Sequence, residues 1–496
     1  MPQPTRMATR TPGSDAFHDR PSGHLQRGAS RSGSRQRFTR ALRSPGLTLL
    51  TIGGIMGSGL FLASGMAIRD AGPAVLGVFA IGFVAMYLEI RALAEMSVAN
   101  PAPGSFLVYC RQVLGPGFSF VSGWIYWFSS VLTMSSEVTA AALLTRVWFP
   151  QWPVWLWALA YSVLIVGVNF VGVRGFGSVE AVLAATKILA VLAFIVLGGL
   201  YLTGRLPHAT GGGLAALSQH GGLWPHGLGG AAGALLLVLF AYAGTGVIGM
   251  AAAETKDPGQ TIPRTVRRTA LLVGVMYLGG VFTLLALVPW WQVPVASSPF
   301  VAAVARTGLP FAAGVMNLVL LLAVLSTMNA ALYANVRVLY SLASQKQAPA
   351  AFGRLSRRGV PANATWASAT LLAATIALAY VLPHKAYAYL VTATGFQAMF
   401  IWLTILLTHI RYRPYLRRHR PERLTYRLFA YPYTTLVVIA IVLSGLAGSL
   451  GAGSERIGAG VGLAGIVAAL VAWLLLRRRL IPRMDPVPPP DPQSPG

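Results

Sequence analysis

The stretch TIGGIMGSGLF, residues 51–61, lies inside the first long apolar segment and carries glycine at positions 53, 54, 57 and 59. A glycine in a helix interior costs roughly 1 kcal/mol relative to alanine, so four of them need a physical reason. One interpretation is close helix packing, because Gly53 and Gly57 form a GxxxG pattern. The other is that the helix unwinds here and turns its backbone groups toward a ligand.

The composition is that of a membrane protein. Of the 496 residues, 55% are hydrophobic and only 10% are charged. Repeated apolar runs reach about 20 residues, which is enough to cross the hydrocarbon core of a bilayer. A single cysteine, Cys110, excludes an intramolecular disulfide and a multi-cysteine metal site. We expect twelve spans, at 46–67, 73–99, 119–145, 153–171, 176–202, 229–252, 265–289, 310–343, 363–382, 386–409, 430–450 and 457–476.

Basic residues indicate the topology. With a cytoplasmic N-terminus, 30 of the 39 lysines and arginines lie in internal tails and loops, and six lie in external loops. Because basic residues hold loops on the cytoplasmic side, we expect both termini to be cytoplasmic. Lipid headgroups then account for the net charge of +26 without nucleic acid. Residues 1–44 and 480–496 are predicted to be disordered tails, and the first lacks the apolar centre of a signal peptide.

The sixth span repeats the feature of the first. FAYAGTGVIG, residues 240–249, contains Gly244-Thr245-Gly246, five spans after Gly57-Ser58-Gly59. An odd offset means that the two helices cross the membrane in opposite directions. Paired glycine-interrupted spans indicate a binding site near the membrane midplane. The break in the first span offers N–H groups to an anion, and the break in the sixth span offers carbonyl groups to a cation. A zwitterionic ligand therefore fits between the two breaks.

Several motifs together resemble the amino acid permeases of the amino acid–polyamine–organocation superfamily. They include GGIMGSGLFLASG, RALAEMSVANPAPGSF, GWIYW, NFVGVRGFG and AAAETKDPGQTIP, in order between about residues 40 and 430. The best match is the bacterial group with permeases for GABA, lysine, aromatic amino acids and D-serine. The resemblance implies an all-α membrane protein with a LeuT-like 5+5 inverted repeat and two further helices. The implied parts are a tail at 1–44, repeats at 45–204 and 205–410, helices 11 and 12 at 411–479, and a tail at 480–496.

The resemblance also implies substrate contacts at the two broken helices. Amides of the first break would meet the substrate carboxylate, and carbonyls just before them would meet its amino group. Two aromatic residues of the sixth helix would shape the pocket, with plain helix packing as the alternative. The residues at these positions are Ile55, Met56, Gly57, Ser58, Gly59, Phe240, Ala241, Tyr242 and Gly244.

Lys187 lies near the centre of the fifth span, about 15 Å from either end at the helical rise. Its stem is too short to reach water from there, and burial disfavours its charged form, which favours proton exchange. The resemblance matches it to a lysine whose ammonium occupies the sodium site of sodium-coupled relatives. Its implied neighbours are first-helix carbonyls near Gly54 and the hydroxyl of Ser326 or Thr327. An ion pair, with Glu137 as the candidate partner, is the structural alternative. We therefore expect protons as the coupling ion, and no sodium or other cofactor.

Glu137 lies in the third span, where a carboxylate is expensive and indicates a functional site. It can bind the amino group of a substrate, carry a proton, or form a hydrogen bond to a neighbouring helix. The sequence leaves all three roles open. Arg91 and Glu95 are spaced i, i+4 and can pair on one helix face. The alternatives are a structural ion pair, snorkelling of the side chains toward the cytoplasmic end, and a cytoplasmic gate. Arg337 is interpreted in the same way. For Glu89, in a position that is apolar in the family, the sequence offers no explanation.

Other polar and aromatic residues favour structural roles. Trp124, Tyr126 and Trp127 begin the third span and are typical of an interfacial aromatic belt rather than a ligand cage. Glu254 is expected to form salt bridges within its basic loop. The histidines form no HExxH pattern, so a zinc enzyme is not indicated.

The sequence as a whole predicts a proton-coupled amino acid importer of a bacterial cytoplasmic membrane. A membrane enzyme would need a convergent nucleophile, base or metal cluster, and a channel would need a continuous polar path; neither is present in the sequence pattern. Amino acid exchange and a GABA-type permease remain the alternatives within transport. No side chain at the expected pocket indicates whether the substrate's side chain is cationic, acidic or aromatic.

Overall fold

A computed structural model describes residues 43–102, 104–171, 173–205, 214–356, 359–381, 385–450 and 453–480. These all belong to one compact unit, Phe38–Gly496. The secondary structure of these residues is helical, with no strand among them. The predicted disordered tails lie outside the described residues, apart from Arg43, Ser44 and Leu480.

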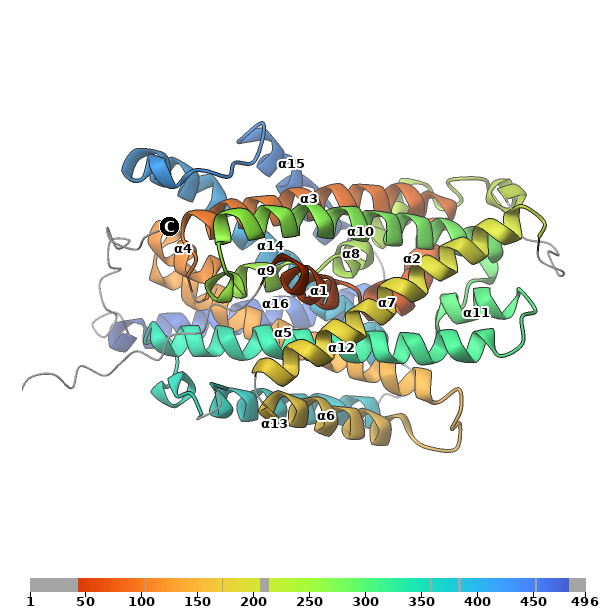
Figure 1. The fold of residues 1–496 in the computed structure, drawn as a ribbon, viewed down its shortest axis with the longest axis horizontal. Coiled ribbons are helices and arrows are strands. Elements are labelled where there is room, and N and C mark those ends of the chain that lie inside the picture. Colours follow the sequence, from red (N-terminus) through yellow and green to blue (C-terminus); the bar gives the residue numbers. More distant parts are fainter. Residues whose placement is uncertain are drawn as a thin grey trace, which may run out of the picture. The chain divides into compact units, whose positions relative to one another are not determined.

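The described residues form sixteen α-helices, labelled in Figure 1, and several short helical turns. The α-helices are α1 Ser44–Ile55, α2 Ser64–Ala71, α3 Val75–Ala99, α4 Phe106–Leu114, α5 Pro116–Thr145, α6 Val154–Val171, α7 Val173–Leu202, α8 Gly227–Ala241, α9 Gly246–Met250, α10 Pro258–Leu287, α11 Pro299–Ala305, α12 Ala312–Ser344, α13 Ala362–Val381, α14 Ala386–His419, α15 Tyr433–Ser449 and α16 Gly453–Leu480. A π-helical turn covers Gly59–Ala63, and 3₁₀ turns cover Gly72–Ala74, Leu214–Ser218, Ala252–Glu254, Trp290–Gln292, Ala350–Gly353 and Pro421–Arg423.

Apolar helices make this a multi-pass membrane protein. Seven stretches of the described residues are long and apolar enough to span a bilayer: Gly59–Ala99, Glu180–Leu202, Gly227–Met250, Pro258–Leu287, Ala312–Ser344, Ala386–His419 and Arg456–Leu480. Three shorter apolar helices are Ser44–Ile55, Val154–Phe170 and Tyr433–Ser449. Helices α5 and α13 coincide with the predicted spans 119–145 and 363–382 but are not among these, so the number twelve stays a prediction.

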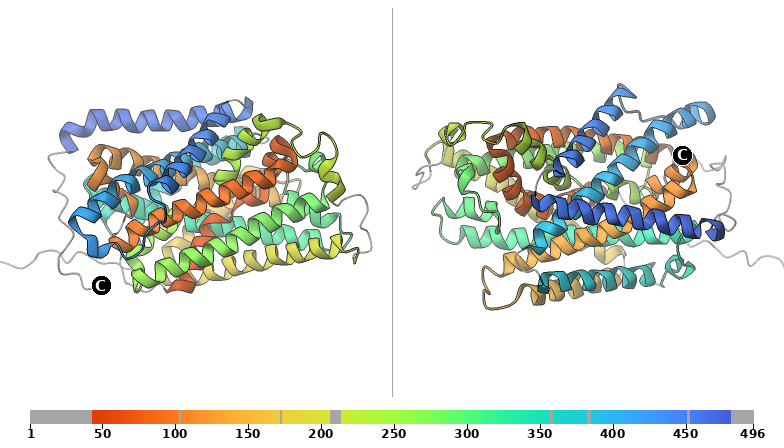
Figure 2. Two further views of the ribbon diagram at one scale, coloured as in Figure 1. Left: turned by 90° about the horizontal axis from the view of Figure 1, so that it is seen from above. Right: turned by 180° about the vertical axis from the view of Figure 1, so that it is seen from behind.

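The short helices of the two interruptions lie in the middle of the bundle. Helix α1 packs against α7, α9, α10 and α12. The long helices pair around it: α3 runs beside α10, α5 beside α12, and α6 beside α13 (Figure 1). Helix α16 packs along α5 and α14 at the edge of the bundle (Figure 2). The centre of the bundle therefore contains the least regular backbone.

Both glycine-rich stretches interrupt their helices, as the sequence predicts. The first helix ends at Ile55, Met56 takes an extended conformation (φ −84°, ψ 91°), and helical structure resumes at Gly59. Helix α8 ends at Ala241 and α9 begins at Gly246, with Gly244 at φ +101° between them. That conformation favours glycine, and a Cβ on Gly244 would also collide with the Gly54 carbonyl oxygen. The two interruptions thus touch each other. The domain boundaries expected for an inverted repeat stay a prediction.

Candidate functional site

A cavity of about 90 Å³ lies beside the two interruptions. Its walls come from the α1 break, α5, the α8–α9 break, α12 and α14. The lining residues are Gly54, Ile55, Gly59, Tyr126, Ser129, Ser130, Thr133, Glu137, Phe240, Ala243, Gly244, Thr245, Gly246, Val247, Thr327, Ala331, Ala334, Ala398, Ile401, Trp402 and Ile405.

The cavity brings together part of the predicted set. Ile55, Gly59, Glu137, Phe240, Gly244 and Thr327 line it. Met56, Gly57, Ser58, Ala241 and Tyr242 do not; they hold the breaks in place through the contacts described below. The Tyr242 hydroxyl donates to Phe79 O at 3.0 Å, and its ring stacks on Tyr277 with the centroids 4.6 Å apart. Tyr242 therefore packs between α3 and α10 in this structure.

One face of α5 supplies polar lining that sequence reasoning missed. Ser129, Ser130 and Thr133 recur at helical spacing with Tyr126 and Glu137, so all five lie on one side of the helix. The expectation that Tyr126 belongs to an interfacial belt is wrong, because it lines this cavity. Trp124 and Trp127 instead line a separate apolar cavity. The helical spacing of serine and threonine within an apolar span was the sequence signal that could have identified this polar lining.

Glu137 is bonded directly to the first break. Its carboxylate accepts hydrogen bonds from the Ser58 amide at 2.9 and 3.1 Å and from the Ser58 hydroxyl at 3.0 Å. The side chain is buried, and it meets the free N–H group that precedes a new helical segment, where negative charge is stabilised. The protein's own carboxylate thus occupies the amide that the resemblance assigns to a substrate carboxylate. Bonding to a neighbouring helix is one of the three alternatives stated above; the other two stay predictions.

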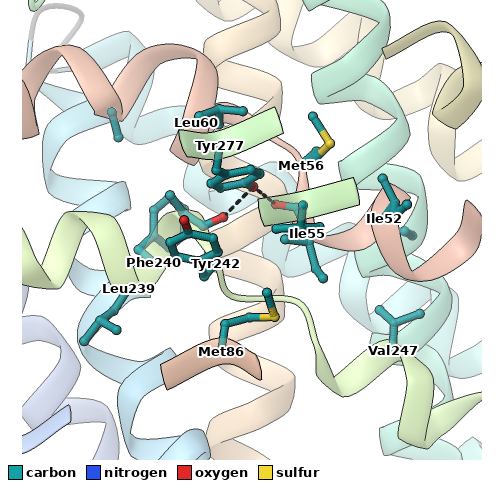
Figure 3. Close-up of a cluster of buried hydrophobic side chains, with 14 of the residues drawn as sticks. Ile52, Ile55, Met56, Leu60, Met86, Leu239, Phe240, Tyr242, Val247 and Tyr277 are labelled. Carbon is teal, nitrogen blue, oxygen red and sulfur yellow. Dashed lines mark hydrogen bonds between the residues drawn. The ribbon is translucent and has the colours of Figure 1, made fainter. Parts of the chain in front are cut away.

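Tyrosine hydroxyls satisfy carbonyls at both breaks. The Tyr277 hydroxyl lies 3.1 Å from Ile55 O and 2.8 Å from Ala241 O, and so links the two interruptions (Figure 3). The Tyr387 hydroxyl donates to Ser58 O at 2.9 Å. Unwound backbone at this depth would otherwise leave buried carbonyls without donors, which is costly. The interrupted geometry is therefore held by specific side chains.

Lys187 holds the first helix through its ammonium group. Its Nζ donates to Gly53 O at 3.0 Å, to Met56 O at 2.9 Å and to Thr327 Oγ1 at 3.3 Å. The Thr327 hydroxyl is itself 2.7 Å from Met56 O. Both sequence-predicted kinds of neighbour are present: a carbonyl on either side of Gly54, and a hydroxyl of α12. Lys187 is 1% exposed, and no ion pair with Glu137 is formed among the described residues.

Ser326 contacts a carboxylate that the sequence analysis did not single out. Its hydroxyl donates to Glu180 Oε1 at 2.6 Å, while Asn329 Nδ2 donates to Glu180 Oε2 at 3.1 Å. The prediction that Ser326 could contact Lys187 is therefore not met; Thr327 does so instead. Glu180 lies two helical turns before Lys187 on the same face of α7, and the two interact electrostatically. The seven-residue spacing between Glu180 and Lys187 can be seen in the sequence GSVEAVLAATK, residues 177–187.

The predicted pairing of Arg91 with Glu95 is wrong. Glu95 Oε2 accepts the Leu428 amide at 2.6 Å and lies 3.5 Å from Arg413 Nη1. The Arg91 guanidinium lies over the Tyr426 ring and donates to a backbone carbonyl, that of Arg427. The loop after α14 supplies these partners, and it outcompetes the neighbour one helical turn away. A gate formed by this pair thus has no geometric basis.

Arg337 forms an ion pair, as expected, but with a partner from another segment. Its Nε lies 2.7 Å from Glu254 Oε1, and its guanidinium lies 3.3 Å from the centroid of the Tyr333 ring. The Tyr333 hydroxyl donates to Glu254 Oε2 at 2.9 Å. Glu254 is thereby tied to α12 rather than only to the basic residues of its own loop.

These features define a class of protein: a helical membrane transporter with two interrupted helices beside a cavity. A solved structure of the Eremococcus coleocola manganese transporter, in complex with an aromatic bis-isothiourea substituted compound, has the same fold. The TM-score is 0.56 at 14% sequence identity, with 91% of this chain and 100% of that chain covered. At this identity the likeness shows the fold alone.

The sequence comparisons identify the family. Residues 46–476 match the family model described as amino acid permease. The chain is 36% identical to the uncharacterized amino acid permease YtnA of Bacillus subtilis over 82% of its own length and 88% of that relative. It is 32% identical to the gamma-aminobutyric acid permease of the same organism, over 90% and 96% of the two chains. The chain belongs to the amino acid permease family, and it is a transporter of amino acids rather than an enzyme.

Proposed function

We propose that this permease imports amino acids by proton symport, with alternating access around the two interrupted helices. The membrane would be the cytoplasmic membrane of a bacterium, with both termini on the cytoplasmic side. The distribution of lysine and arginine supports that orientation. The proposed architecture behind it is the 5+5 inverted repeat, with one interruption in each half.

The observation that carries the proposal is the position of the Lys187 ammonium. It lies on two carbonyl oxygens of the interrupted first helix and beside a hydroxyl of α12. Carbonyl and hydroxyl oxygens of this kind coordinate cations at unwound helices of transporters. A protonated lysine would brace α1 against α12 as a bound metal cation would. Loss of the proton would remove the positive charge and weaken that brace, so that protonation and helix position become coupled.

The same geometry argues against sodium coupling through this site. A sodium ion placed on Gly53 O, Met56 O and the Thr327 hydroxyl would compete with the ammonium for the same oxygens. Two cations at one buried site repel each other strongly in a medium of low dielectric constant. Coupling to sodium would then require Lys187 to be displaced or neutral.

The test is uptake of radiolabelled amino acids by purified protein in proteoliposomes. We expect accumulation when the vesicles are acidic outside and contain no sodium on either side. A sodium gradient at equal pH on both sides should drive no accumulation. Uptake that occurs only when the vesicles are preloaded with amino acid, regardless of the pH gradient, would instead establish exchange and overturn symport.

A further inference from the structure

Glu89 of α3 has a buried carboxylate without a basic partner among the described residues. The residue is 0% exposed, and apart from the Thr245 hydroxyl beside it neither carboxylate oxygen has a hydrogen-bond partner within the described part of the chain. The other buried glutamates of that part are all bonded: Glu95, Glu137, Glu180 and Glu254. Burying a carboxylate with nothing to compensate it is expensive, especially within a membrane. Such a group points to a ligand that supplies the missing partner.

Glu89 faces the interruption between α8 and α9. It shares one face of α3 with Gly82 and Leu93, since they are seven and four residues away. Gly82 packs against α8, where an added Cβ would lie 2.9 Å from the Tyr242 ring. Leu93 packs against α9, 3.2 Å from where a Cβ on Gly249 would lie. Between these contacts, Glu89 is directed at the unwound segment.

Two residues of the cavity wall lie next to this carboxylate. Thr245 is its polar neighbour in the unwound segment, and Tyr126 of α5 interacts with it electrostatically. Both line the cavity described above. The Thr245 hydroxyl is buried and has no partner other than this carboxylate among the described residues. A buried carboxylate whose polar neighbour is one neutral hydroxyl thus lies behind one end of the cavity.

Glu137 is the carboxylate in the cavity wall, Glu89 lies behind that wall beside Tyr126 and Thr245, and no basic residue lines the cavity among those described. Glu137, at the Ser58 amide, marks the end where the backbone of an amino acid would lie. Glu89 and Thr245 mark the other end. None of the described residues supplies a positive charge at that end.

We propose that Glu89 and the Thr245 hydroxyl form a subsite for the cationic end of a substrate side chain. The permease would accordingly prefer amino acids with basic side chains, such as arginine, lysine and ornithine, over neutral ones of the same shape. This inference rests on the proposed amino acid import and names the substrate class of that site.

The test compares isosteric pairs that differ in side-chain charge. Proteoliposomes with wild-type protein take up arginine or citrulline, and ornithine or norleucine, under the same pH gradient. We expect a strong preference for the cationic member of each pair. In Glu89→Gln that preference should fall roughly tenfold to hundredfold, the factor expected for losing a charge-assisted hydrogen bond. Thr245→Val should lower it less, because it removes a neutral partner.

Glu422→Gln, in the exposed 3₁₀ turn Pro421–Arg423, removes the same charge far from the cavity and serves as the matched control. It should leave the preference unchanged. Wild-type protein that transports only neutral amino acids would overturn the subsite while leaving amino acid import intact. A Glu89→Gln variant with altered pH dependence of uptake but unaltered substrate preference would overturn the subsite as well. That result would show that Glu89 carries a proton and does not bind the substrate side chain. Absence of any amino acid uptake would overturn both proposals.

Discussion

Replacing Gly57 with alanine tests whether the first interruption forms the binding site. A Cβ at this position would lie 2.5 Å from Glu137 Oε1 and 2.7 Å from Thr327 Cγ2. Both distances are well inside van der Waals contact. The methyl group must therefore displace the carboxylate from the Ser58 amide, or push α1 away from α12.

The expected magnitude follows from the cost of overpacking. Inserting a methyl group into a filled site costs about 1–3 kcal/mol. If that cost falls on the substrate-bound state, affinity drops by about 5- to 150-fold, at a factor of ten for each 1.4 kcal/mol. Gly57→Leu should abolish binding altogether, because its side chain is much larger.

The assay is equilibrium binding of a radiolabelled substrate to purified protein, with the thermal midpoint in detergent as a check on folding. Gly77→Ala is the matched control, because a Cβ on Gly77 of α3 would contact nothing within 4 Å. We expect Gly77→Ala to bind as wild type does. If Gly57→Ala binds with the same affinity as Gly77→Ala, the glycine is a packing residue and the reasoning is refuted.

Two further substitutions address buried carboxylates. Glu137→Gln keeps the volume but removes the negative charge at the Ser58 amide, so uptake should show lower affinity or a flatter profile between about pH 5 and pH 8; unaltered kinetics across that range would leave Glu137 a structural residue. Arg337→Ala leaves the Glu254 carboxylate buried and unpaired, at a cost of roughly 3–5 kcal/mol. It should lower the thermal midpoint in detergent, and adding Glu254→Gln should restore part of the loss; a midpoint that stays at the wild-type value would contradict this.

The interrupted helices were predictable because glycine lowers the stability of a helix locally, whatever the tertiary contacts are. The glycines of residues 51–61 and the repeated pair Gly244 and Gly246 marked two spans for interruption, although helix α1 continues through Gly53 and Gly54 and ends only at Ile55. Burial of Lys187 was predictable for a similar reason, since its place within an apolar run sets its depth. Its contacts with the first-helix backbone and with Thr327 agree with the resemblance to the family.

Partners across the bundle were less predictable, because they depend on how each helix is rotated and on where distant loops return. Glu95 pairs with the loop at Leu428 rather than with Arg91, more than 300 residues closer in the chain. Ser326 and Thr327 are neighbours in sequence, yet the helix turns one toward Glu180 and the other toward Lys187. No local pattern distinguishes these outcomes.

The most direct test of the central claim is accumulation driven by a pH gradient in sodium-free proteoliposomes carrying Lys187→Ala. Lys385→Ala, at an exposed position before α14, removes the same side chain outside the bundle and is the control. The account predicts wild-type accumulation in the control and none in Lys187→Ala, while substrate binding to that variant survives. Accumulation by Lys187→Ala at the wild-type level, or a strict sodium requirement in the wild type, would contradict it.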